Sequence, residues 1–154
     1  MYKRDIYTVL SNEPLTPAVY RMVLEGDTQY ITRSGQFINI ELEGKFLRRP
    51  ISVSDYDAQT ITIIYKVVGG GTDQMSHMAP GTKLDILTGL GNGLNTENSP
   101  ERPLLVGRGA GVPPLYNLCK RLLSEGKKPM VILGFNTKDE IFYEEEFKAL
   151  GVDV

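Results

Sequence analysis

The sequence predicts a small antiparallel β-barrel followed by the beginning of a parallel α/β unit. Two observations support this fold class. The first hundred residues alternate short strand-like segments with turn signals, and the remainder runs from a buried strand through a glycine-rich turn into an amphipathic helix. Short strands at regular spacing are typical of barrels, whereas strand–helix–strand order implies a parallel sheet. We therefore expect a six-stranded barrel domain over residues 1–99 and an incomplete α/β domain over residues 100–154.

Six segments of the first part carry the β signal. Ile38–Leu42 and Ile61–Val67 alternate apolar with polar residues, as half-buried strands do, although Ile64 interrupts the polar face of the second. Turn-forming residues such as Pro80-Gly81 separate the segments. Four weaker strands are expected at Ile6–Leu10, Val19–Leu24, Pro50–Ser54 and Lys83–Leu87.

The second part begins after a polar linker, Asn95–Arg102. Leu104–Val106 predicts a short buried strand, and Gly126 is placed to end the helix that follows the glycine-rich turn. Apolar residues recur at helical spacing in that helix: Val112, Leu115, Tyr116, Cys119, Leu122 and Leu123. The remaining expected elements are a strand at Met130–Leu133, a helix at Glu144–Leu150 and the start of a third strand at Val152–Val154.

The composition is that of an ordinary globular chain. Its 154 residues are 41% hydrophobic and 23% charged, which argues against disorder. With 17 basic and 19 acidic residues, the net charge of −2 gives no electrostatic reason to expect nucleic acid or an anionic membrane as a partner. No apolar run approaches the roughly 18 residues of a membrane span, and no signal peptide is evident. We expect a cytoplasmic protein.

Cysteine and histidine are too scarce for metal chemistry. A single cysteine excludes an internal disulfide and a multi-cysteine metal or iron–sulfur site within these residues. Cys119 lies on the apolar stripe of the predicted helix and is expected to be a core residue. The single histidine, His77, has no acid or nucleophile placed by the sequence to form a triad with it. No metal site and no catalytic side chain are predicted.

Two adjacent arginines, Arg48 and Arg49, precede the strand-like segment Pro50-Ile51-Ser52. A guanidinium can hold a phosphate in a bidentate fork, and proline stiffens the backbone that carries it. The alternative is that both arginines are solvated side chains at the entry to a strand. For most arginine pairs taken alone, the solvated alternative is the correct one.

Gly69-Gly70-Gly71 leads from the best-defined strand into a short helix expected at Thr72–Met78, with Thr72 or Asp73 as its N-cap. Glycine-rich backbone at a helix N-terminus presents free N–H groups to an anion. A flexible turn before a capped helix explains the same residues equally well.

Gly107–Leu115 lies between a strand and a helix, which is the context of a nucleotide-binding turn. Its spacing is G-x-G-x-G rather than the usual G-x-G-x-x-G, so the glycines alone are weak support. A further cluster, Gly89–Gly93, suggests an irregular loop packed close to something that the sequence does not identify.

Taken together, these segments resemble the ferredoxin–NADP reductase superfamily. Within it, Leu47–Ser52, Gly89–Leu94 and Val106–Leu115 are most similar to the electron transfer subunit of class B dihydroorotate dehydrogenase. The resemblance covers essentially the whole chain, and the combination of motifs is specific although no single motif is. It implies an FAD-binding barrel joined to part of an NAD-binding domain.

The resemblance also implies site residues. Arg49 would bind the FAD pyrophosphate, Ser52 would lie near flavin N5, and Gly71 and Thr72 would contact the phosphates through backbone and hydroxyl. The FAD-site residues implied are Arg49, Pro50, Ile51, Ser52, Ile63, Ile64, Tyr65, Gly71 and Thr72. Those implied for the NADH pyrophosphate are Gly107, Gly109, Ala110, Gly111, Val112 and Pro113.

The implied function is electron transfer in pyrimidine biosynthesis. Electrons would pass from NADH to FAD, to a [2Fe-2S] cluster, and to the FMN-containing catalytic subunit of dihydroorotate dehydrogenase, the expected partner. Such chemistry belongs to the cofactors, so the lack of a catalytic His or Cys is no objection. The alternatives are another ferredoxin or flavodoxin reductase, or a cofactor-free barrel that acts as an interaction module.

Two departures from the family pattern affect these expectations. Arg108 stands where the family usually has another glycine, and it could either neutralise a pyrophosphate or obstruct close approach of the backbone. The family's cysteine-rich cluster-binding segment is absent from these 154 residues. We therefore expect the chain to be truncated relative to the family and inactive by itself.

Overall fold

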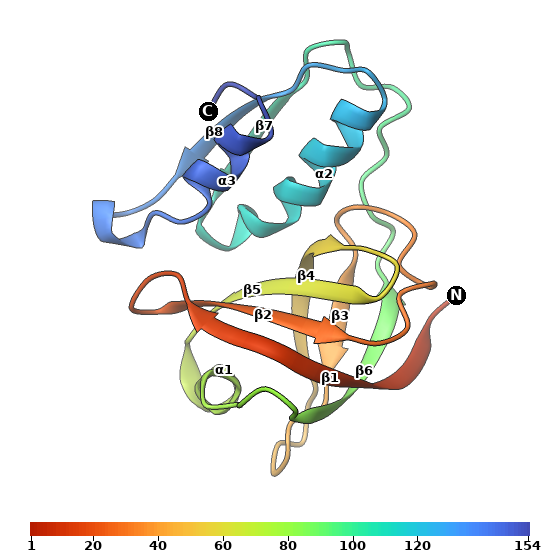
Figure 1. The fold of residues 1–154 in the computed structure, drawn as a ribbon, viewed down its shortest axis with the longest axis vertical. Helices are drawn as coiled ribbons and strands as arrows, with labels where there is room; N and C mark the ends of the chain where they lie inside the picture. Colours follow the sequence, from red (N-terminus) through yellow and green to blue (C-terminus); the bar gives the residue numbers. More distant parts are fainter.

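The computed structural model describes residues 1–154, and six antiparallel strands close into a barrel in its first part (Figure 1). The order around the barrel is β1–β2–β5–β4–β3–β6. This confirms the predicted six-stranded barrel. The strands are β1 (Lys3–Pro14), β2 (Val19–Glu25), β3 (Phe37–Ile40), β4 (Arg49–Tyr56), β5 (Thr60–Lys66) and β6 (Lys83–Leu90).

The alternation read from the sequence becomes the inside and outside of this barrel. Ile61 and Ile63 of β5 are fully buried and pack inward with Ile38 and Ile40 of β3. β3 ends at Ile40, two residues earlier than the pattern predicted, although Leu42 still packs into the same core. β1 is longer than predicted because it pairs with β2 along its second half and with β6 along its first.

Helix α1 (Gly69–Ser76) closes the lower end of the barrel in Figure 1. The prediction for its start was wrong, because the three glycines form its first turn and Val68 is the N-cap residue. Thr72 does not cap the helix. Its hydroxyl instead bridges back to Val68, accepting from the backbone N–H at 2.7 Å and donating to the carbonyl at 2.8 Å. Thr72 therefore fixes the turn that leads from β5 into α1.

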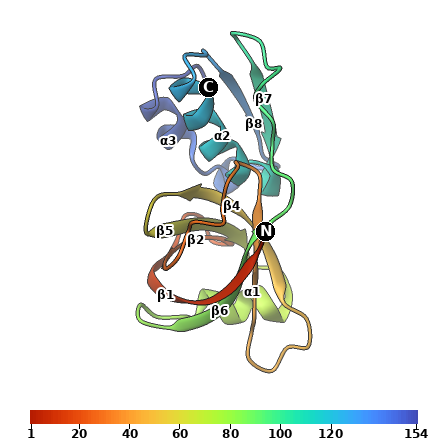
Figure 2. The same cartoon turned by 90° about the vertical axis from the view of Figure 1, so that its right-hand side faces the viewer.

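The second part has the predicted strand–helix–strand order. β7 (Leu104–Arg108) and β8 (Met130–Gly134) are parallel neighbours, connected through α2 (Pro113–Ser124). A short 3₁₀ turn at Gly109–Gly111 precedes α2, and another at Lys138–Glu140 precedes α3 (Glu144–Ala149). The predicted third strand amounts to one parallel bridge between Met130 and Asp153, and α2 ends before Gly126 as expected. Figure 2 shows this unit above the barrel, next to β4 and β5.

One shared core joins the two parts. Leu115, Leu118 and Leu122 of α2 pack with Val131 of β8, and residues from the outer surface of the barrel join them. Among these is Ile64, which is only 5% exposed. Because the core of the second unit covers this outer face of β5, an apolar residue is favoured where the alternation predicts a polar one.

Polar contacts across the same junction hold α2 on β4. Asn117 of α2 hydrogen-bonds Ser34 at 2.5 Å and donates to the Asp55 carboxylate at 2.9 Å. Lys120, one turn further along, pairs with the other oxygen of Asp55 at 2.7 Å. Ser34 is buried, so this network sets the position of α2 over the barrel as well as stabilising it. No helix in the structure is long and apolar enough to cross a membrane.

Candidate functional site

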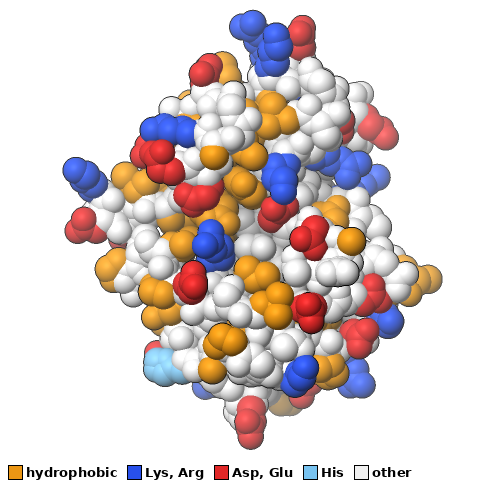
Figure 3. All heavy atoms as spheres, viewed as in Figure 1, with side chains coloured by type: hydrophobic (Ala, Val, Ile, Leu, Met, Phe, Trp, Pro, Cys, Tyr) orange, Lys and Arg blue, Asp and Glu red, His pale blue; other side chains and the backbone are white.

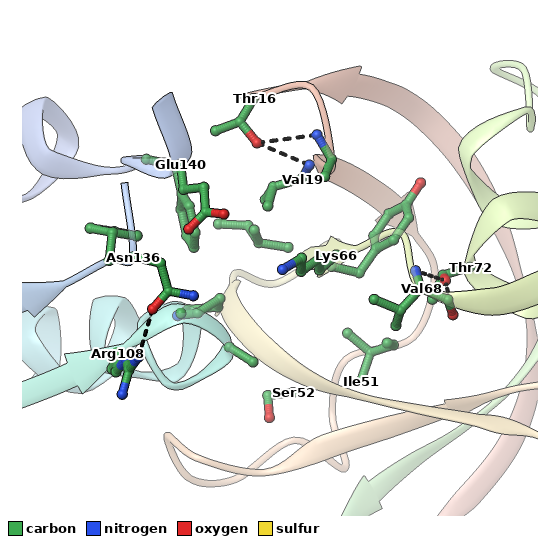
Figure 4. Close-up of a pocket in the computed structure, with 18 of the residues that line it drawn as sticks. Thr16, Val19, Ile51, Ser52, Lys66, Val68, Thr72, Arg108, Asn136 and Glu140 are labelled. Atoms are coloured by element: carbon green, nitrogen blue, oxygen red, sulfur yellow. Dashed lines mark hydrogen bonds between the residues drawn. The ribbon is translucent and has the colours of Figure 1, made fainter. Parts of the chain in front are cut away.

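A cleft of about 560 Å³ lies where the barrel meets the second unit. Its size is within the range of small-molecule and cofactor sites, which favour such junctions. Hydrophobic side chains gather along this seam, with charged groups beside them (Figure 3). One wall comes from β4, β5 and the turn before α1, and the other from the ends of β7 and β8 (Figure 4).

The two arginines before β4 have different surroundings. Arg49 lines the cleft together with Pro50, Ile51 and Ser52. Arg48 is held on the outside of the barrel, where it pairs with Asp85 at 2.8 Å and with Glu41 at 3.1 Å. Arg48 is thus an ion-paired residue of the barrel surface, whereas Arg49 brings a guanidinium to the cleft.

The end of the cleft next to Arg49 is formed by the first turn of α1. A Cβ atom added at Gly71 would lie 2.5 Å from Arg49 Nη2, so glycine is needed for this close approach. The first N–H groups of an α-helix have no acceptor within the helix. Thr72 is 3% exposed and its hydroxyl is engaged with Val68, so the donors that this turn offers are backbone N–H groups.

Tyr65 of β5 forms part of the cleft and is tied to α1. Its hydroxyl donates to Asn12 Oδ1 at 2.7 Å, and the Asn12 amide donates to the carbonyls of Met75 and Met78 near the end of α1. The Tyr65 ring stacks on Tyr20 at a centroid distance of 5.9 Å. Burial raises the pKa of Tyr65 to about 12, so its hydroxyl remains protonated and acts as a donor.

The opposite wall presents a second guanidinium. Arg108, at the end of β7, donates to Asn136 Oδ1 at 2.6 Å, and both residues line the cleft (Figure 4). The side chains of Lys66 and Glu140 point into the same cavity from the two walls (Figure 4). The structure therefore places Arg108 at the cavity, held by a hydrogen bond to the loop that follows β8.

The N-terminus of α2 is poor in backbone donors. Pro113 and Pro114 occupy the first two positions and have no N–H group. The N–H of Leu115 is bonded to the Val112 carbonyl, and the N–H of Val112 to that of Gly109. The positive potential that attracts an anion to this turn would therefore come from the backbone of Gly109–Gly111 and from the Arg108 side chain.

The structure brings most of the predicted residues together around the cleft. Those that line it are Arg49, Pro50, Ile51, Ser52, Ile64, Tyr65 and Thr72 on the barrel side, and Gly109, Ala110 and Pro113 on the other. Those outside the lining are Ile63, Gly71, Gly107, Gly111 and Val112.

Their positions explain why four of these five are outside it. Ile63 faces the barrel core and Val112 the second core, and both are fully buried. A Cβ on Gly107 would meet the Leu115 side chain at 2.6 Å, so this glycine permits close strand–helix packing. Gly71 lies behind the Arg49 guanidinium. The Gly89–Gly93 loop packs instead against residues 30–37 of the barrel.

Sequence reasoning missed several lining residues. They are Thr16, Ala18, Val19, Lys66, Val68, Phe135, Asn136, Glu140 and Phe142. Arg108, whose effect the sequence left open, also lines the cleft. Phe135 and Asn136 follow β8 directly, and ligands of parallel sheets bind beyond the carboxyl ends of the strands, so this rule could have indicated them. No local signal marks the turn that carries Thr16 and Ala18.

Cys119 and His77 take no part in this site. Cys119 is fully buried in the second core, where burial raises the pKa of its thiol to about 11, as expected for a core cysteine. His77 lies on the surface at the end of α1 and contacts Ser76 (Figure 3, pale blue). No group of three or more His, Cys, Asp or Glu side chains is placed to hold a metal ion.

The sequence is similar to curated proteins along nearly its whole length. It is 43% identical over 152 residues to the dihydroorotate dehydrogenase B (NAD(+)) electron transfer subunit of Fusobacterium nucleatum, covering 94% of the chain and 59% of that protein. It is 42% identical to the corresponding subunit of Bacillus pumilus, covering 97% and 61%. The chain thus spans about three fifths of the length of these relatives. No protein-family model matches it.

Solved structures give the same relationship at the level of the fold. The NADH-dependent reduced ferredoxin-NADP oxidoreductase, a bifurcating flavoprotein, superposes with a TM-score of 0.86 at 29% identity, covering 97% of the chain and 55% of that structure. Phthalate dioxygenase reductase superposes with a TM-score of 0.80 at 16% identity, covering 97% and 49%. The chain is therefore similar along nearly its whole length to the dihydroorotate dehydrogenase B electron transfer subunits and has the fold of the ferredoxin–NADP reductases.

Proposed function

We propose that the cleft binds FAD and that the chain is the flavin-binding part of an NADH-oxidising electron transfer subunit. The observation that carries this proposal is the pairing of Arg49 with the glycine turn of α1 at one end of an otherwise largely apolar cleft. A guanidinium beside free backbone N–H groups suits a pyrophosphate, and aromatic and aliphatic walls suit a flavin ring.

The residues present fit FAD. Arg49 and the N–H groups of the first α1 turn would hold the pyrophosphate, while Pro50, Ile51, Ser52, Ile64 and Tyr65 would enclose the flavin. Gly71 would contribute by leaving room for Arg49, and Thr72 by fixing the turn through Val68. Bound FAD would supply the redox chemistry by accepting a hydride from NADH. The protein's part is to position the two and to keep water from the junction.

The nicotinamide dinucleotide would approach from the β7–α2 side. Arg108, Gly109, Ala110 and Pro113 line this wall, and the Arg108–Asn136 hydrogen bond holds the guanidinium toward the cleft. Because the two prolines remove backbone donors from α2, Arg108 is proposed as the main positive charge for the NADH pyrophosphate. The names of the relatives support NAD rather than NADP.

A [2Fe-2S] cluster does not fit these residues. The one cysteine is buried in the second core, and four thiolate ligands are usual for such a cluster. We derive no step through a cluster from this chain. By analogy with the relatives, we propose that the partner is the catalytic subunit of dihydroorotate dehydrogenase. We also propose a cytoplasmic location, because no signal peptide is evident in the sequence. The proposed domains are 1–99 for FAD and 100–154 for the dinucleotide.

The proposal is tested by titrating FAD into the chain and following quenching of flavin fluorescence. Arg49→Ala should weaken FAD binding by about 1.5–3 kcal/mol, the usual contribution of a hydrogen bond to a charged group. Arg102→Ala, which alters an exposed arginine of the linker, is the matched control and should bind normally. A colourless chain that cannot be reconstituted with FAD, or unchanged affinity in Arg49→Ala, contradicts the proposal.

A further inference from the structure

The loop between β3 and β4, residues 41–48, projects from the same end of the molecule as α1 (Figures 1 and 2). We propose that its tip, Lys45 and Phe46, forms the binding site for the adenosine diphosphate half of FAD. This inference rests on the proposed function and extends it from the flavin cleft to a second subsite.

The position of Lys45 is the first observation. A Cβ atom added at Gly70 would lie 2.8 Å from Lys45 Nζ, just as one at Gly71 would lie 2.5 Å from Arg49 Nη2. Consecutive glycines of one helical turn thus each have a cation above them. Arg48, between the two in sequence, is paired with Glu41 and Asp85, whereas Lys45 and Arg49 form no ion pair. Two uncompensated cations above one turn leave a site that an anion with two phosphates would neutralise.

Phe46 is the second observation. Its side chain is 100% exposed, and the neighbouring Leu47 is 75% exposed. Val68, 58% exposed, is a third apolar side chain at this end of the cleft. An exposed aromatic ring can stack on any nucleobase, and this stacking contributes favourable binding free energy. An adenine ring would cover an aromatic surface that the protein itself leaves in water.

The order of groups along FAD connects the two observations. If Arg49 and the α1 turn hold the pyrophosphate, the flavin occupies the cleft and the adenosine must leave it at the Arg49 end. The loop tip lies at that end, because Lys45 contacts the same turn. FMN has the flavin and one phosphate but no adenosine. The loop tip would therefore select FAD over FMN, which the cleft alone does not explain.

The test compares the affinities of FAD and FMN for the unaltered chain and for loop variants. Phe46→Ala should weaken FAD binding roughly five- to a hundredfold and leave FMN binding unchanged. Lys45→Gln should weaken FAD more than FMN, and Lys45→Arg and Phe46→Tyr should restore affinity. Lys128→Gln, an exposed lysine between α2 and β8, is the control. Because the loop tip is exposed, none of these changes should unfold the barrel.

A second readout uses the absence of tryptophan from the chain. Phe46→Trp introduces a single fluorophore at the loop tip, and ADP, which has no flavin to absorb its emission, should change its fluorescence. If the unaltered chain binds FAD but Phe46→Ala binds FAD normally, or loses FAD and FMN affinity equally, the inference is overturned and the proposed function stands. If the unaltered chain binds no flavin, the proposed function itself fails.

Discussion

Arg49 and Gly71 approach so closely that no side chain fits between them: a Cβ on Gly71 would lie 2.5 Å from the guanidinium Nη2. Gly71→Ala should therefore push the guanidinium aside. The fold should tolerate the change, because the displaced group is the end of a flexible side chain and alanine is the better helix former. We expect FAD affinity to fall roughly tenfold, the scale of one charge-assisted hydrogen bond, with an unchanged urea midpoint.

Gly111→Ala is the matched control for this prediction, because a Cβ there meets nothing within 4 Å. It should leave FAD affinity as it is. Equal flavin affinity in Gly71→Ala and in the unaltered chain would show that the contact between Arg49 and the α1 turn does not matter for binding.

Ile64 is expected to hold the second unit on the barrel. It faces outward from β5 yet is only 5% exposed, because the second core covers it. Ile64→Ala should cost about 2–5 kcal/mol, the usual range for truncating a buried isoleucine, and should let the second unit unfold before the barrel. Urea unfolding followed by circular dichroism would then show two transitions.

Ile6→Ala provides the comparison, since Ile6 also faces outward from the barrel but is 55% exposed. The urea midpoint of Ile6→Ala should differ little from that of the unaltered chain. If Ile64→Ala and Ile6→Ala have equal effects, the second core does not depend on the barrel surface.

Hydrogen exchange should differ between the two sheets. β5 is paired on both sides, with β2 and β4, whereas β7 pairs with β8 alone. The outer face of the small sheet is open to solvent, because its residues Leu104, Val106 and Ile132 are each 54–64% exposed. Parallel sheets are usually covered on both faces. Amides of β7 and β8 should therefore exchange faster than those of β5. Equal, strong protection of both sheets in a dilute monomer would contradict this expectation.

Cys119 should make the chain less stable at alkaline pH. Burial raises the pKa of its thiol from 9.0 to about 11. Between these values the unfolded chain releases the proton and the folded chain keeps it, so rising pH favours unfolding by up to about 1.4 kcal/mol per pH unit. Below pH 9 this effect vanishes.

The check is to measure the free energy of unfolding from pH 7 to 11 in the unaltered chain and in Cys119→Ala. The variant loses some stability at every pH, but its curve should fall less steeply above pH 9. Parallel curves throughout the range would show that the thiol does not titrate differently in the two states.

The sequence by itself determined the elements and much of the site. Alternation at Ile61–Val67 and helical spacing from Leu115 to Leu122 predicted strand and helix because those periods are local properties of the backbone. The arginine before Pro50 and the glycines after β5 could be read as phosphate-binding features for the same reason. Each is a short run of residues whose chemistry does not depend on distant partners.

The tertiary structure alone decided which of these features meet. Arg48 and Arg49 are neighbours in sequence, but Asp85 holds the first on the barrel surface and the cleft contains the second. Gly107 matches a nucleotide-binding pattern in the sequence, and in the structure it packs closely against Leu115. Ile64 broke the strand pattern because the core of the second unit covers it. Such contacts join residues far apart in the chain, and no local period or propensity encodes them; only the closed barrel and the packing of α2 upon it bring them together.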